Sequence, residues 1–108
     1  MVRVASVREL VEGQVPAATR ILAEACGADK PRVSPDAVGA LWQEAYDHLS
    51  DFLIDEYACD LLDYVSARDI AILAVALYLD GADGEEWFDA ALDCLRARYD
   101  RLLERLND

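Results

Sequence analysis

Residues 70–79, with the sequence IAILAVALYL, constrain the fold of this chain more than any other segment. A helix built from them is apolar around its whole circumference, and a helix of that kind is stable in water only when other helices surround it. The segment has about half of the roughly 20 residues that a membrane-spanning helix requires. We therefore predict a central buried helix over residues 67–79 and no membrane span.

Helix-capping residues predict where the helices begin and end. Ser66, with Asp69 three residues later, has the pattern of a helix N-terminus, and Gly81 is expected to end that helix. Comparable patterns predict four more helices, beginning at Ser6 with Glu9, at Pro16, at Ser34 with Pro35 and at Asp83 with Glu86, the first two ending at Gly13 and Gly27. No segment alternates polar and apolar residues as a half-buried strand does. Residues 1–108 are therefore predicted to form a single all-α domain, a compact bundle of about five helices around the central one.

The apolar residues of 35–65 change sides partway along the segment. Up to residue 52 they share one helical face: Val38, Leu41, Trp42, Ala45, Leu49 and Phe52. From residue 54 they lie on roughly the opposite face: Ile54, Tyr57, Ala58, Leu61 and Val65. A straight helix with one buried face cannot accommodate both sets. Either the chain breaks near Asp55, which would then cap a new helix, or one continuous helix is buried on different sides at its two ends, which would imply a partner surface.

The last predicted helix carries a heptad pattern. Six apolar residues recur at spacings of four and three: Phe88, Leu92, Leu95, Tyr99, Leu102 and Leu106. An arginine stripe flanks them on one side, formed by Arg98, Arg101 and Arg105. Packing within the chain's own bundle is the default explanation for such a short heptad run. The alternative hypothesis is that this helix pairs with a helix of another subunit. Together with Tyr57 and Leu61, these six residues form the apolar seam that we predict as a partner-binding surface.

The chain is strongly acidic, with 22 Asp and Glu against 10 basic residues and a net charge of −12 at pH 7. Such a charge repels a phosphate backbone and argues against direct nucleic-acid binding. Carboxylates form one predicted partner-binding stripe at Glu44, Asp47, Asp51 and Asp55, and continue in Glu56, Asp60 and Asp63. Such a row fits a basic protein partner or, as a nucleic-acid mimic, the cleft of a nucleic-acid-binding protein. Adaptation to high salt would produce the same acidity without a partner.

Catalytic and metal-binding patterns are missing from the sequence. His48 is the single histidine, so a site with two imidazoles is excluded, and the three cysteines lack C-x-x-C spacing. The segment DGADGEE at 80–86 departs from a calcium loop, because Glu85 stands where that loop requires glycine. We find no phosphate-binding loop, dinucleotide fingerprint or nucleophile elbow. The sequence therefore predicts a protein without enzymatic activity, cofactor or metal.

Residues 36–80 combine two helical segments, ALWQEAYDHLSDFL and then ARDIAILAVALYL, the second ending near a tyrosine. In this arrangement the chain resembles the head-to-tail connector (adaptor) proteins of tailed phages. Asp80 and Gly81 stand where that family usually has basic residues. The resemblance implies a ring-forming structural subunit of a virion, without catalytic residues.

Two functions follow as hypotheses from these patterns. The leading one is a non-enzymatic protein–protein interaction or structural subunit, which binds a protein partner or forms a homo-oligomer. The alternative is an acidic inhibitor that mimics nucleic acid. We expect the protein in the cytoplasm, or in a virion if the connector resemblance holds.

Overall fold

The computed structural model describes residues 7–57, 61–83 and 86–107. Four α-helices and one short 3-10 helix occur in this part of the chain: α1 (Val7–Cys26), α2 (Pro35–Tyr57), η1 (Leu62–Tyr64), α3 (Ala67–Asp83) and α4 (Trp87–Asn107). The described residues contain no strand, which confirms the all-α prediction. The predicted number of about five helices is slightly too high.

The surplus helix comes from the N-terminal region, where α1 runs unbroken through Gly13 and Pro16. The prediction of two helices there is wrong. An interior proline costs a helix about 3 kcal/mol and a glycine about 1 kcal/mol. Four of the buried residues of α1 nevertheless follow one helical face across both positions: Val11, Val15, Ala18 and Leu22. Burying a valine or leucine side chain contributes about 1.5–3 kcal/mol. Burial of this face therefore outweighs the local preference for a break.

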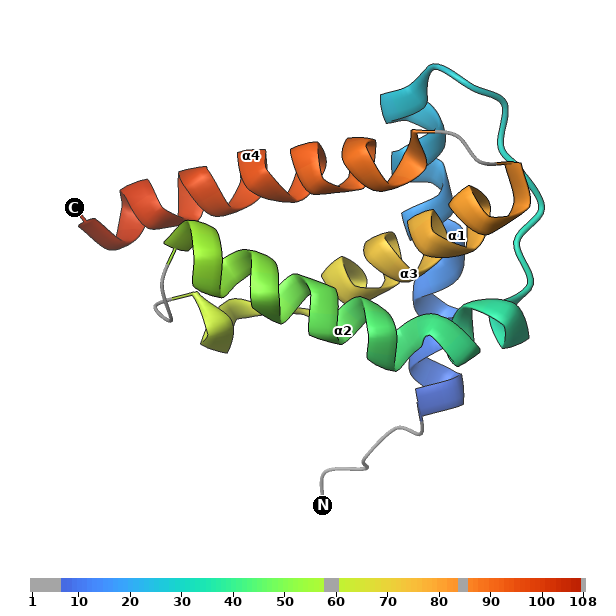
Figure 1. The fold of residues 1–108 in the computed structure, drawn as a ribbon, viewed down its shortest axis with the longest axis horizontal. Helices are drawn as coiled ribbons and strands as arrows, with labels where there is room; N and C mark the ends of the chain where they lie inside the picture. The colour runs from blue at the N-terminus through green and yellow to red at the C-terminus, as the bar shows by residue number, and fades with distance from the viewer. Residues whose placement is uncertain (1–6, 58–60, 84–85, 108) are drawn as a thin grey trace.

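Helix α3 is the central element, as its all-round apolar sequence predicts. It packs against α1, α2 and α4, and its residues from Ile70 to Ala76 are all buried. Figure 1 shows α2, α3 and α4 extending in broadly similar directions while α1 crosses them. The molecule is flat, with extents of 40 × 40 × 20 Å. Among the described residues, no helix has the length and apolarity that crossing a membrane requires.

Three predicted helix boundaries are confirmed by hydrogen bonds at the helix ends. The Ser34 carbonyl accepts from the Val38 amide at the start of α2. At the start of α3, the Ser66 hydroxyl accepts from the Asp69 amide at 3.2 Å. Gly27 ends α1 with a φ of +65°, and the Ala28 amide donates back to the Ala23 carbonyl at 2.9 Å. This last arrangement is a Schellman motif, which favours glycine because of its positive φ.

The junction of α3 and α4 differs from its prediction. Gly81 lies inside α3, which continues to Asp83, so the predicted stop at Gly81 is wrong. The Asp80 carboxylate accepts hydrogen bonds from the backbone amides of Trp87 and Phe88, at 3.0 and 3.1 Å. Both amides belong to the first turn of α4, where a side chain commonly serves as the acceptor. A side chain from the end of one helix thus caps the next.

The segment 35–65 contains a break rather than one continuous helix. α2 ends at Tyr57, two residues beyond the predicted point at Asp55, and η1 begins at Leu62. Asp55 lies within α2, so it does not cap a new helix. Leu61 is fully buried after the break. Of the second apolar set, Ile54 and Tyr57 still lie in α2, where Ile54 is exposed, whereas Leu61 and Val65 follow the break and pack in or against the core.

Candidate partner-binding site

The outward surface of α2 carries most of the predicted acidic stripe. Glu44, Asp47, Asp51 and Asp55 are all exposed. They follow one another at spacings of three or four residues, which places them in a row along the helix. The opposite face enters the core with Val38, Ala45, Leu49 and Leu53. We call the four exposed carboxylates the α2 acidic row.

Nothing on α2 itself neutralises this row with a permanent positive charge. The helix contains six carboxylate residues and no lysine or arginine. His48 Nε2 lies 3.7 Å from Glu44 Oε1, and the Gln43 amide donates to Asp47 Oδ1 at 3.1 Å. Ile54, two turns after Asp47, is 46% exposed and adds an apolar contact surface beside the row.

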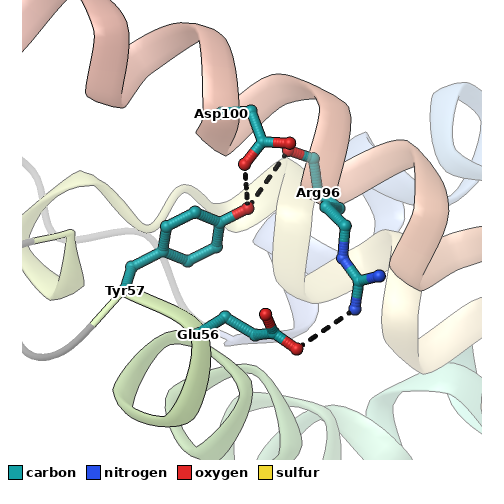
Figure 2. Close-up of polar contacts among 4 residues, drawn as sticks. All are labelled: Glu56, Tyr57, Arg96 and Asp100. Carbon is teal, nitrogen blue, oxygen red and sulfur yellow. Dashed lines mark hydrogen bonds and ion pairs between the residues drawn. The ribbon is translucent and has the colours of Figure 1, made fainter.

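The other edge of α2 faces α4, and side chains of α2 reach across to make this contact. The Tyr57 hydroxyl donates to Asp100 Oδ1 at 2.6 Å and lies 3.3 Å from the Arg96 carbonyl oxygen. Arg96 in turn donates to Glu56 Oε1 at 3.3 Å, as Figure 2 shows. Burial, together with the Asp100 hydrogen bond, raises the pKa of Tyr57 to about 12.

Aromatic rings complete the α2–α4 contact. The Arg96 guanidinium lies 5.6 Å from the centre of the Phe52 ring, and the His48 ring lies edge-on to Phe88 at 5.6 Å. A guanidinium over an aromatic face is attracted by the ring electrons. The two helices are therefore joined by a line of polar and aromatic contacts.

The second part of the acidic stripe is not a free surface of the predicted kind. Glu56 is held by Arg96 and faces α4. Asp63 is exposed on η1, beyond the end of α2. Asp60 lies outside the described residues. The structure thus keeps the first four carboxylates together and separates the remaining described ones from them.

The apolar seam is mostly occupied by the chain itself. Leu61, Leu95 and Tyr99 are fully buried in the core. Four others are partly buried and pack against that core: Tyr57, Phe88, Leu92 and Leu102. Leu106 is 47% exposed near the end of α4. The prediction of a partner-binding seam is wrong for the three fully buried residues, because α4 lays its heptad face on its own bundle.

A buried polar cluster between α3 and α4 was not predicted. Asp69 is 1% exposed and accepts a hydrogen bond from the Tyr99 hydroxyl at 2.7 Å and another from Arg98. Burial and the bond to Asp69 raise the pKa of Tyr99. The sequence assigns Asp69 to the start of α3 and Tyr99 to the apolar seam, 30 positions apart, so their pairing depends on the packing of the two helices.

Comparison with known proteins gives no external guide to this site. No protein-family model, no curated protein and no solved structure matches the chain. The assignment of function therefore depends on the geometry and charge of the site alone.

Proposed function

We propose that this chain is a non-enzymatic protein-interaction or structural subunit that docks onto a basic protein surface through the α2 acidic row. One observation carries the proposal. Asp47, Asp51 and Asp55 are exposed, and none of them forms an ion pair with any lysine or arginine in the described part of the chain. A partner with arginines or lysines would supply the missing charges.

The electrostatics of the row favour a bound state over the free one. Like charges one turn apart destabilise an isolated helix by a few tenths of a kcal/mol for each pair, roughly 0.2–0.5 kcal/mol. A basic partner relieves this repulsion and is attracted to the row over about 10 Å at moderate salt. Complementary charge of this kind mainly accelerates association and selects the partner. Ile54 provides an apolar contact beside the charges.

Quantitative affinity purification from the source cells tests the proposal with two variants of equal charge. D47N/D51N/D55N removes three charges from the row, whereas D89N/D93N/E104Q removes three exposed carboxylates from α4. We expect the wild type and the α4 variant to recover the same basic protein. The α2 variant is expected to lose it, and higher ionic strength should weaken the wild-type interaction.

Equal recovery by both variants would contradict the proposal, because the row would then contribute nothing. The purified partner must then bind the purified chain directly, and it must bind the wild type and the α4 variant more tightly than the α2 variant. Light scattering after size exclusion, on wild type alone, identifies the case in which the partner is a second copy. That case is the one that the resemblance to phage connector proteins implies, and it agrees with our proposal of a virion subunit if that resemblance holds.

The acidic row also favours one second candidate, an inhibitor that mimics nucleic acid. A row of uncompensated carboxylates on a regular helix can fill a basic cleft that normally holds phosphates. The two candidates differ in one measurement. An inhibitor displaces DNA or RNA from its partner at concentrations close to the partner's own, whereas a structural subunit leaves nucleic-acid binding unchanged.

A further inference from the structure

A pocket lined by arginines, opposite in charge to the α2 acidic row, lies between α1, α3 and α4. It has a volume of about 520 Å³ and lies between the end of α1, the start of α3 and the second half of α4. Ile21, Ile72 and Leu102 supply apolar walls. Four of the chain's ten basic residues line it: Arg68, Arg98, Arg101 and Arg105. This concentration is unexpected in a chain of net charge −12.

Three of these arginines keep their charge uncompensated. Arg98 pairs with the buried Asp69, which also lines the pocket. Arg68, Arg101 and Arg105 are exposed and form no ion pair with any carboxylate of the described residues. The pocket therefore has an excess of about three positive charges, although the chain has more than enough carboxylates to pair them all.

The sequence explains how the arginines meet. Arg98, Arg101 and Arg105 recur at spacings of three and four, so they share one face of α4. Arg68 belongs to the first turn of α3, and the backbone amides of that turn give the helix N-terminus a partial positive charge. Packing of α3 against α4 brings both sources of positive potential to the same pocket.

We propose that this pocket binds a small phosphate monoester with an apolar substituent. A guanidinium group matches the oxygens of a phosphate through paired hydrogen bonds, and several guanidinium groups suit a doubly charged anion. The apolar walls require a hydrophobic part next to the phosphate. The volume lies within the range of about 300–1,000 Å³ that small-molecule sites occupy. This site is separate from the α2 acidic row and does not depend on its function.

Binding is tested by titrating the full chain with phenyl phosphate and measuring the amide chemical shifts by NMR. We expect saturable shifts for residues around Ser66, Arg68 and Leu102. Inorganic phosphate should bind more weakly, because it leaves the apolar walls uncovered, and phenol more weakly still. Added salt should weaken the phenyl phosphate complex.

Two double variants of equal net charge separate a built site from general attraction. R101Q/R105Q removes two arginines that line the pocket, and R8Q/R32Q removes two exposed arginines outside it. Loss of two charge-assisted contacts should raise the Kd roughly tenfold or more, whereas the control should change it less than about twofold. A thermal melt checks the fold of each. If R101Q/R105Q does not fold, R68Q replaces it, with an expected increase of at least about threefold.

Several results would overturn this proposal. They are the absence of saturable shifts in the wild type, shifts centred outside the pocket, and equal binding of phenol and phenyl phosphate. Equal weakening in the pocket and control variants would also overturn it, because the attraction would then come from net charge alone.

Discussion

Two tyrosine–aspartate contacts hold α4 to its neighbours, and they differ in burial rather than in length. Tyr99 donates to Asp69 of α3 at 2.7 Å, and Tyr57 of α2 donates to Asp100 at 2.6 Å. Asp69 and Tyr99 are fully buried, whereas Asp100 is exposed. An arginine completes each cluster.

Burial determines how much each contact contributes to stability. Water can replace the partner of an exposed group, so the net value of a surface hydrogen bond or ion pair is small, roughly 0–1 kcal/mol. A buried group that loses its partner has no substitute and retains the full cost of desolvation, roughly 1–3 kcal/mol. The α3–α4 contact should therefore be a structural requirement, and the α2–α4 contact an adjustable connection.

The substitution Asp69→Ala should have the largest effect. It leaves the buried Tyr99 hydroxyl without an acceptor and removes the counter-charge of Arg98, so we expect a loss of about 3 kcal/mol in the free energy of unfolding. Urea denaturation at neutral pH measures it. The matched control Asp100→Ala should cost less than about 1 kcal/mol. Equal losses would remove the basis for the comparison.

Tyr99→Phe should have the next largest effect. The ring remains in the core, and only the hydrogen bond to Asp69 is lost, while Arg98 still contacts the carboxylate. We expect about 1–2 kcal/mol of destabilisation by the same urea measurement. Tyr57→Phe is its counterpart at the surface and should cost about 0.5–1 kcal/mol. A larger effect at Tyr57 than at Tyr99 would reverse our assignment of the two contacts.

Alkaline pH should weaken the fold through both tyrosines. The pKa of Tyr57 rises from its ordinary value of 10.0 to about 12 in the folded chain, and burial also raises the pKa of Tyr99. Since the unfolded chain releases these protons first, the contribution of each tyrosine is complete below pH 10.0. The contribution of Tyr57 is lost as the pH rises through about 12, and that of Tyr99 at still higher pH. Urea midpoints across this interval should fall less steeply in Tyr57→Phe. If the urea midpoint of Tyr57→Phe fell as steeply with pH as that of the wild type, the pH dependence would come from groups other than Tyr57.

Glu56→Gln should have the smallest effect. The carboxylate and Arg96 are each about half exposed, at 49% and 47%, so water and salt screen their attraction. We expect a change of at most about 0.5 kcal/mol, diminishing as ionic strength rises. A loss above about 1 kcal/mol would mean that the α2–α4 contact is as rigid as the buried one.

Local sequence determined much of the secondary structure. The apolar run around residues 70–79 predicted the central helix, and Ser34, Ser66 and Gly27 predicted three helix ends that the structure confirms. These features depend on neighbours within a few positions, because capping and helical periodicity are local effects. The exposed row on α2 was predictable for the same reason.

Only the tertiary structure decided the features that join distant segments. Burial of one face kept α1 continuous through Pro16, against its local preference. Packing placed Asp80 at the start of α4, Tyr99 against Asp69, and Arg68 beside the arginines of α4. Periodicity shows which side of a helix is apolar, but not which helix will cover it. That choice depends on the total area buried by all the helices together, which no single segment of the sequence contains.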